Sequence, residues 1–184
     1  GSQRWTAKVL TTPRAPEEGV MQGIFQVLQK SQLRPEEVGI KLHGTTLATN
    51  AIIEKRGALT ALVTTKGFRD IVDIGYESRY DQYDLQIEKK RPLTPRSLRF
   101  TVSQRHSARG EELTPLDEMG VRRLVPQLRA AGVTSVAICY FHSYANPVHE
   151  QRTRDLILEA MPEISVTLSC EVCPEIREYE RSTT

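Results

Sequence analysis

The sequence predicts an α/β fold in which a mixed or parallel sheet is flanked by helices. Two runs of strand length, residues 58–65 and 133–141, are almost continuously apolar, which is typical of strands that are buried on both faces. Helical patterns bounded by glycine or proline alternate with these runs. Over residues 39–65, a strand, a helix and a strand are predicted within about thirty residues, which is the spacing of a βαβ unit in a parallel sheet.

The first third of the chain contains five expected elements. They are, in order, a strand at 5–10, a helix at 17–30, a strand at 39–42, a helix at 47–57 and a strand at 58–65. The second helix is expected because Leu47, Ala51 and Ile52 recur at helical spacing and Gly57 stands where a helix would stop.

The rest of the chain continues the pattern after an irregular stretch. Residues 67–95 show no sustained period and predict a short helix followed by a long excursion. The later elements are a strand, turn and return at 97–113, a helix at 116–131, a strand at 133–141, a helix at 146–162 and a strand at 164–169. In the first of these helices Met119, Leu124 and Leu128 share a face, although Pro126 must kink it or leave a backbone acceptor unpaired.

Composition and charge narrow the classes of function. The chain has 184 residues, of which 39% are hydrophobic and 26% charged, and its net charge is +2 with the two signs interleaved. These values indicate an ordinary globular chain, expected to form a single domain over 1–184, with small molecules or proteins rather than nucleic acid or membrane as partners. No apolar run approaches the roughly 18 residues of a membrane helix, and no signal-peptide layout precedes the first element, so a cytoplasmic protein is expected.

A polar turn, HGTT at 43–46, stands where a strand is expected to hand over to a helix. In open α/β sheets, ligands bind beyond the carboxyl ends of strands, where helix amino termini present unpaired N–H groups. Gly44 permits close approach of the backbone, Thr45 and Thr46 offer hydroxyl groups, and His43 can exchange a proton near neutral pH. The turn predicts a site for a carboxylate, a phosphate or a polarised carbonyl. The alternative is that Thr45 only caps the helix and His43 only ends the strand.

A second polar cluster lies close to the carboxyl end of the sequence. The string EIREYER places Glu175, Arg177 and Arg181 within seven positions, together with Glu178 and Glu180. Such a set could orient a substrate or bind a metal, but it is also the pattern of a solvated helix face held by ion pairs one turn apart. The sequence leaves the metal ligands unidentified.

The cysteines and two of the histidines indicate a functional site less clearly than these two clusters do. Three cysteines do not make a disulfide framework and suit a reducing compartment. Cys170 and Cys173 have CxxC spacing, but no further pair of ligands completes a zinc set, so structural cysteines are expected. His142 follows a predicted strand and could face a site or serve the loop, whereas His149 lies in a predicted helix.

No GxxxxGK[ST], GxGxxG, GxSxG or HExxH motif is present, but longer strings resemble a known family. These strings are KVLTTP at 8–13, HGTTLATNAIIEKRGALTALVTTKGFRDIVDIG at 43–75, LTPLDE at 113–118, CYFHSYANPVHE at 139–150 and SCEVCPEIREYERSTT at 169–184. Together, in this order, they resemble the amino-terminal region of the hydantoinase A and 5-oxoprolinase family, whose relatives include acetone and acetophenone carboxylase subunits.

The resemblance implies part of an ATP-dependent enzyme with an actin-like nucleotide-binding architecture, as in sugar kinases and Hsp70. It implies that the parent protein phosphorylates the carbonyl oxygen of a cyclic amide before the ring opens, using ATP and Mg²⁺ or another divalent metal, with a hydantoinase B-type subunit or domain as partner. It supports His43, Thr45 and Thr46 as catalytic candidates. Gly44, Thr49, Asn50, Glu175, Arg177 and Arg181 are the candidates for binding substrate or phosphate.

The resemblance also marks what these 184 residues lack. Family proteins place a strand and a glycine- and threonine-rich phosphate loop before the KVLTTP-like segment and continue far past the STT end. We therefore expect an excised portion of a longer chain, with Gly1 and Ser2 left from cloning, that has no turnover or bound cofactor by itself. Two alternatives are a portion of an ATP-dependent ketone carboxylase subunit and a non-catalytic module that docks a partner through Tyr76, Tyr80 and Tyr83.

Overall fold

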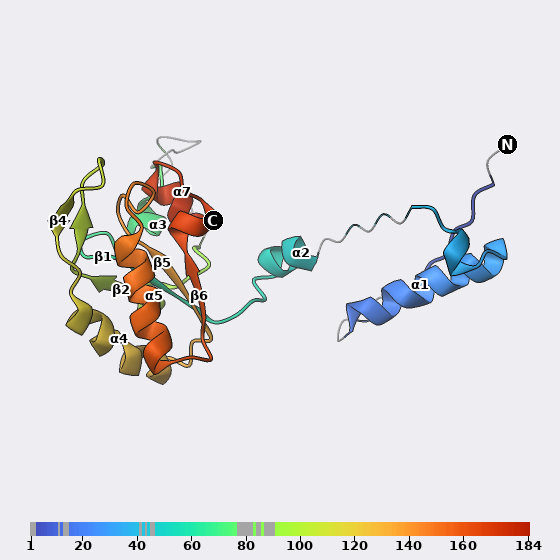
Figure 1. Cartoon of the computed structure of the whole chain (residues 1–184), viewed down its shortest axis with the longest axis horizontal. Helices are drawn as coiled ribbons and strands as arrows, with labels where there is room; N and C mark the ends of the chain where they lie inside the picture. The colour runs from blue at the N-terminus through green and yellow to red at the C-terminus, as the bar shows by residue number, and fades with distance from the viewer. Residues whose placement is uncertain are drawn as a thin grey trace. The chain divides into compact units, whose positions relative to one another are not determined.

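The computed structural model describes residues 3–10, 12, 15–40, 42, 44, 47–76, 83, 86 and 91–184. The chain divides into two compact units, residues 1–48 and 49–184 (Figure 1). None of the helices in these described ranges is both long and apolar enough to cross a membrane.

The first unit is organised around one long helix, α1 (Pro16–Ser31), followed by the short 3₁₀ helix η1 (Pro35–Glu37). Pro16 opens α1, Glu17 and Glu18 lie in its first turn, and Gln32 ends it in the left-handed conformation at φ 59°. This helix confirms the prediction for 17–30.

The two strands expected in the first unit do not form. Residues 5–10 and the described residues of 39–42 have no regular secondary structure. The amino-terminal segment instead packs along α1: Lys30 Nζ donates to the Thr6 carbonyl at 3.0 Å, and Gly23 leaves room for Val9. The prediction was wrong because side-chain alternation alone does not supply a second strand to pair with.

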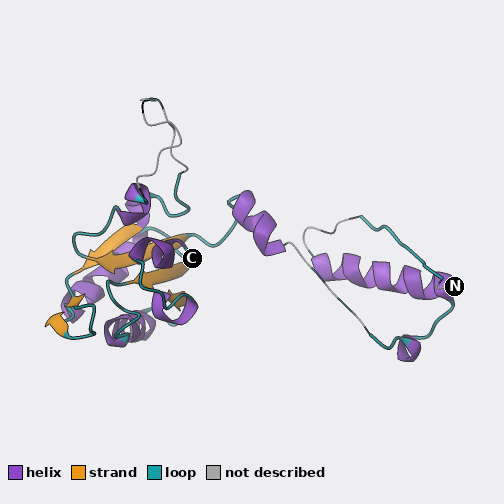
Figure 2. Cartoon of the chain, turned by 90° about the horizontal axis from the view of Figure 1, so that it is seen from above, coloured by secondary structure: helices purple, strands orange, loops and turns teal. Residues whose placement is uncertain are grey.

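The second unit contains a four-stranded parallel sheet, which confirms the predicted α/β class. Its strands are β1 (Thr60–Thr65), β2 (Arg99–Val102), β5 (Ser135–Cys139) and β6 (Ser165–Leu168), and their order across the sheet is β2-β1-β5-β6. The registers pair Val63 with Phe100 on one side and with Ile138 on the other. Figure 2 shows helices on both sides of these strands.

The remaining elements connect or cover the strands. A two-stranded hairpin consists of β3 (Arg105–His106) and β4 (Glu112–Thr114), with Gly110 at φ 82° in its turn. The helices are α2 (Leu47–Ile53), α3 (Ile71–Ile74), η2 (Arg96–Leu98), α4 (Glu118–Ala130), α5 (Val148–Ala160), α6 (Ser169–Val172) and α7 (Glu178–Thr183). The expected helix at 47 is therefore present, and α4 continues through Pro126.

The main core lies between the sheet and the helices α4 and α5. It joins apolar side chains of alternate strand positions to those of the two helices, among them Val63, Ile138, Leu128 and Leu156. Met119 is 63% exposed, so the predicted apolar face of α4 was wrong at this residue. Met119 is the second residue of α4, whereas Leu124 and Leu128 belong to its buried stripe.

The opposite face of the sheet is covered by the carboxyl-terminal helix. Ile138 belongs to the core formed with α4 and α5, whereas the next residue, Cys139, places its Sγ 3.2 Å from Ser182 Oγ on α7. Because successive strand residues point to opposite faces, α5 and α7 lie on opposite sides of β5. Along the chain, β2 is added on one side of β1, whereas β5 and β6 are added on the other side. Open α/β sheets bind ligands beyond the carboxyl ends of the strands at such a switch in strand order, which here lies between β1 and β5.

Candidate functional site

The carboxyl ends of β1, β2 and β5 meet in a buried polar cluster. Thr65 ends β1, and its Oγ1 accepts hydrogen bonds from the Phe141 N–H at 3.0 Å and from Gln104 Nε2 at 2.5 Å. Thr65 is 2% and Gln104 3% exposed. These bonds fix the loops after the three strands to one another, at the edge where the strand order reverses.

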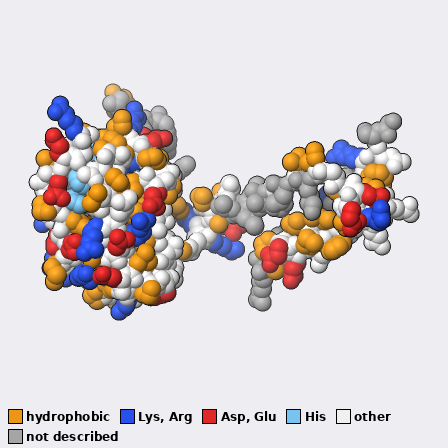
Figure 3. All heavy atoms as spheres, in the orientation of Figure 1, with side chains coloured by type: hydrophobic (Ala, Val, Ile, Leu, Met, Phe, Trp, Pro, Cys, Tyr) orange, Lys and Arg blue, Asp and Glu red, His pale blue; other side chains and the backbone are white. Residues whose placement is uncertain are grey.

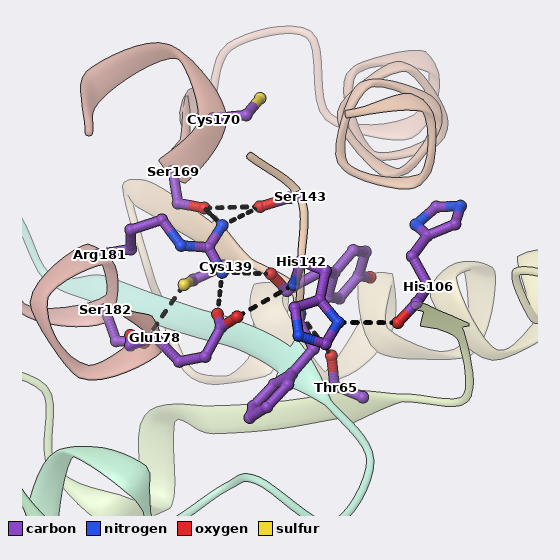
Figure 4. A network of polar contacts seen from close by, with 12 residues as sticks. Thr65, His106, Cys139, His142, Ser143, Ser169, Cys170, Glu178, Arg181 and Ser182 are labelled. Carbon is purple, nitrogen blue, oxygen red and sulfur yellow. Dashed lines mark hydrogen bonds and ion pairs between the residues drawn. The ribbon is translucent and has the colours of Figure 1, made fainter. Parts of the chain in front are cut away.

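His142 follows β5 in a backbone conformation that histidine rarely adopts. Its φ is 58°, which costs a side-chain-bearing residue about 1 kcal/mol or more. Two bonds hold it there: its N–H donates to Glu178 Oε1 at 3.1 Å, and its Nδ1 lies 2.9 Å from the His106 carbonyl (Figure 4). Since a carbonyl only accepts, Nδ1 carries a proton, and in the neutral ring Nε2 is left as an acceptor.

Arg181 is the centre of a network of hydrogen bonds next to this loop. Its side chain is fully buried, although it is only three residues from Thr184. The guanidinium donates to the Tyr140 carbonyl at 2.9 Å and to Ser169 Oγ at 3.3 Å, and it also contacts Ser143 Oγ and the carboxylate of Glu178 (Figure 4). Arg181 therefore anchors α7 to the ends of β5 and β6.

Glu150 is a second buried charge, and the hydroxyl group of Ser169 connects it to Arg181. It is completely buried near the start of α5. Its Oε1 accepts from the Tyr140 N–H at 2.8 Å and from the Ser169 hydroxyl at 2.6 Å, and its Oε2 accepts from the Cys170 N–H at 3.0 Å. These three bonds compensate for the loss of solvent and fix the ends of β5 and β6 at the base of α5.

Of the three residues of the carboxyl-terminal cluster that were predicted to bind substrate or phosphate, the structure brings only Arg181 into this network. Glu175 and Arg177 are exposed, and Arg177 Nη1 lies 3.5 Å from Glu180 Oε1 in a surface ion pair. Arg181 pairs with Glu178 one turn away, as the helix-face alternative allowed, but the pair is buried rather than solvated.

Of the HGTT turn, the structure describes only Gly44. His43, Thr45 and Thr46 lie outside the described residues. Among described atoms, none lies within 4 Å of a Cβ built on Gly44, so its surroundings there are open. Thr49 and Asn50 lie exposed on α2, directly after the turn.

The cysteines and the predicted docking tyrosines have clear local environments. All three cysteines are free, and burial raises the pKa of Cys139 and, with Glu150, raises the pKa of Cys170 to about 12. Tyr76 packs edge-on against Tyr179, with ring centroids 4.9 Å apart, and donates to Glu180, which raises the pKa of Tyr76. Tyr80 lies outside the described residues.

Sequence reasoning did not identify Thr65, Gln104 or Glu150 as parts of one polar cluster. The local signal for Glu150 was its position in NPVHE at the start of a helix that follows a strand. Thr65 and Gln104 are separated by 39 positions, so only the parallel pairing of β1 with β2 reveals that they meet. On the face of the second unit drawn in Figure 3, basic and acidic side chains are interspersed, as the sequence predicts.

Comparison with known proteins places this architecture in a family. Residues 2–161 match the family described as "Hydantoinase/oxoprolinase N-terminal region". The chain is 36% identical to an uncharacterized protein of Methanocaldococcus jannaschii, over 96% of this chain and 26% of that protein. It is 33% identical to the caprolactamase subunit alpha of Pseudomonas jessenii, over 96% of this chain and 27% of that subunit.

Solved structures agree with the sequence comparison. The crystal structure of the ATP-dependent caprolactamase from Pseudomonas jessenii matches 96% of this chain and 26% of its own with a TM-score of 0.82. The nucleotide-free structure of acetone carboxylase matches 95% of this chain and 27% of its own, with a TM-score of 0.83 and 26% identity. The chain thus spans about a quarter of the length of these relatives. The match of residues 2–161 confirms the resemblance seen in the sequence: the chain belongs to the hydantoinase/oxoprolinase family and corresponds to its N-terminal region.

Proposed function

We propose that this chain is the amino-terminal portion of an ATP-dependent cyclic-amide hydrolase of the hydantoinase or 5-oxoprolinase type. The observation that carries the proposal is the 33% identity and TM-score of 0.82 to the ATP-dependent caprolactamase, over 96% of this chain. The 184 residues alone have no turnover, because phosphoryl transfer depends on a complete set of positioned donors around the transferring group.

The chemistry that we propose activates a resonance-stabilised amide. The amide oxygen attacks the γ-phosphorus of ATP, the bond from that phosphorus to ADP breaks, and ADP leaves. Water then adds to the amide carbon and the ring C–N bond breaks, with a proton transferred to the nitrogen, which leaves an acyl phosphate. A second water releases inorganic phosphate and the open-chain acid.

Within this reaction, the HGTT turn is the proposed contribution of the chain to binding. Thr45 and Thr46 donate hydrogen bonds to phosphate or substrate, and His43 orients a polar group or exchanges a proton. The open surroundings of Gly44 among described atoms support close approach of a ligand to the backbone. Thr49 and Asn50, exposed on the following helix, are further proposed ligand contacts.

Arg181 has a different part in this proposal from Glu175 and Arg177. Its side chain is fully buried, with Nη1 and Nη2 directed at Tyr140, Ser143, Ser169 and Glu178, so it positions the loops beyond β5 and β6 rather than contacting substrate. Glu175 and Arg177 are exposed and remain proposed ligand contacts. ATP with Mg²⁺ or another divalent metal and a hydantoinase B-type subunit or domain complete the proposed enzyme.

The competing function is a portion of a ketone carboxylase subunit, which the TM-score of 0.83 to acetone carboxylase supports. That enzyme class consumes bicarbonate and a ketone instead of water and a cyclic amide. A docking module is a third proposal, supported by the exposure of Tyr76, at 57%, and of Tyr83, at 89%. Docking would be favoured if a substitution of Tyr83 abolished partner binding while the protein stayed folded.

ADP release by the complete protein with its partner subunit discriminates these functions. Mg-ATP is supplied with 5-oxoproline, hydantoin, caprolactam, or acetone with bicarbonate. We expect stimulation by a cyclic amide without bicarbonate and loss of that stimulation in the Thr45→Ala/Thr46→Ala protein, while the control Thr134→Ala, at an exposed loop threonine, keeps it. Stimulation that requires both a ketone and bicarbonate would refute the hydrolase.

A further inference from the structure

Two histidines and a glutamate converge beside the polar cluster at the sheet edge. His106 lies in β3, Glu112 in β4 and His149 in the first turn of α5. Each contributes one potential ligand atom, and these atoms all lie within 4.8 Å of one another. Imidazole nitrogens and a carboxylate oxygen are the donors that zinc and related divalent transition metals prefer.

One ring nitrogen of His106 has no hydrogen-bond partner among the described residues. The residue is 2% exposed, and its Nδ1 is buried without a hydrogen-bond partner among the described residues. A buried polar atom without a partner is uncommon in folded proteins and requires a physical explanation. The ring of His106 also stacks on that of His149, with centroids 4.0 Å apart, so the two imidazoles are held together on one side of the hairpin.

His149 is oriented as a metal-binding histidine would be. It is 4% exposed, and its Nδ1 lies 3.2 Å from Gln104 Oε1. Gln104 is fixed in turn by the bond from its Nε2 to Thr65 Oγ1. A ligand histidine generally donates its second ring N–H to an oxygen acceptor, which fixes the tautomer and aims the other nitrogen at the metal.

That other nitrogen faces a carboxylate. His149 Nε2 lies 2.8 Å from Glu112 Oε2, so both ring nitrogens face oxygen acceptors. Either the hydrogen of a ring N–H or a metal ion can lie between Nε2 and the carboxylate. A hydrogen on Nε2 joins His149 to Glu112 but leaves Nδ1 of His106 without a partner among the described residues, whereas a metal ion uses all three side chains.

We propose that His106, His149 and Glu112 bind a divalent transition metal of the Zn²⁺ class. Three protein ligands of this type leave a fourth tetrahedral position for water or another ligand. The side chain of Glu112 is 53% exposed, so it can turn to admit an ion to its contact distance of about 2 Å. Figure 3 shows histidine atoms at the surface of the second unit beside acidic side chains.

The proposed metal joins the β3–β4 hairpin to α5 next to the loop that carries His142. The carbonyl of His106 accepts the bond from His142 Nδ1, so a metal that fixes His106 also fixes the ring of His142. This role is positional. It does not depend on the proposed hydrolase activity, and its failure would leave that proposal unchanged.

Metal binding to the complete, tag-free protein tests the proposal. After dialysis against a chelator, Zn²⁺ is titrated by calorimetry and bound metal is counted by mass spectrometry, with Co²⁺ as a spectroscopic probe of tetrahedral geometry. The exposed Glu112 is changed in Glu112→Gln, and Glu111→Gln, at the neighbouring exposed glutamate of the same hairpin, is the matched control.

We expect the wild type and Glu111→Gln to bind one more Zn²⁺ per chain than Glu112→Gln, or to bind it at least about tenfold more tightly. Zn²⁺ should also raise the Tm of the wild type more than that of Glu112→Gln. Equal Zn²⁺ stoichiometry and affinity in wild type and Glu112→Gln would overturn the proposal. A Co²⁺ spectrum that His106→Ala and Glu112→Gln both leave unchanged would overturn it too.

Discussion

Ser169 donates its hydroxyl proton to Glu150 Oε1 over 2.6 Å, while Ser169 Oγ accepts a bond of 3.3 Å from the guanidinium of Arg181. One hydroxyl thus connects a buried carboxylate at the start of α5 to a buried guanidinium in α7. Because both charges are removed from water, each depends on the polar groups that surround it. This connection positions the loops after β5 and β6.

Glu150→Gln should lower the free energy of unfolding by about 3 kcal/mol. The amide nitrogen of glutamine would face an N–H donor, either that of Tyr140 or that of Cys170, and one acceptor would be lost. Urea denaturation followed by circular dichroism measures the change. Glu159→Gln is the matched control on the same helix: its exposed pair with Arg122 should be worth less than about 1 kcal/mol. Equal stability of the two variants would contradict this account of Glu150.

Arg181→Lys should destabilise the fold by about 2 kcal/mol even though it keeps the positive charge. An ammonium group cannot reach the Tyr140 carbonyl, Ser169 and Glu178 in the same planar arrangement as the guanidinium. The exposed Arg177 provides the comparison, since Arg177→Lys should change the free energy of unfolding by less than about 0.5 kcal/mol. A fully stable Arg181→Lys protein would show that only the charge matters.

Cys139 and Cys170 should resist alkylation in the folded protein. Thiolate is the reactive form, and a pKa of about 12 for Cys170 leaves about one thiol in ten thousand ionised at pH 8. Cys139 is buried, and burial raises its pKa as well. Iodoacetamide treatment at pH 8 followed by peptide mass spectrometry should find both unmodified in the native protein and modified in urea. Rapid native labelling of Cys170 would indicate a redox or nucleophilic environment instead.

The ion pair between Glu118 and Arg152 should make the contact between α4 and α5 sensitive to acid. Arg152 donates two bonds, of 2.7 and 2.8 Å, to the Glu118 carboxylate and lowers its pKa below the ordinary 4.5. A lowered folded-state pKa contributes stability that is present above the unfolded-state value and lost as the pH falls through the folded-state value.

Unfolding free energies of wild type and Glu118→Gln, measured from pH 7 to pH 3, test this pair. The difference between them should be constant near neutrality and shrink below about pH 4.5. It should also shrink in high salt, since both side chains are 43% exposed. A difference that grows in acid would reverse the predicted sign.

The sheet could be predicted from the sequence because its central strands carry their own signal. β1 and β5 are almost continuously apolar, and the helices between them have glycine or proline at their ends. The segment 5–10 has a strand-like alternation but lies along α1 without a strand partner, a tertiary fact that no local pattern reveals.

The polar clusters were less accessible to sequence reasoning for the same reason. Glu150 and Ser169 are 19 positions apart, and His149 and Glu112 are 37 positions apart. The first pairing follows from parallel strands whose carboxyl ends share one edge, and the second from the contact of the β3–β4 hairpin with α5, so both emerge only with the tertiary structure. The charge pattern of 175–181 did identify a polar segment, but it could not distinguish the buried Arg181 from the exposed Arg177.

The most direct test of the central claim is the coupling of ATP cleavage to ring opening by the complete protein with its partner subunit. ADP and the open-chain acid are measured together for each cyclic amide, with and without ATP. We predict that one cyclic amide stimulates ADP release, that ADP and acid form in equal amounts, and that no acid forms without ATP. Ring opening that continues without ATP, or ADP release that no cyclic amide changes, would contradict the account.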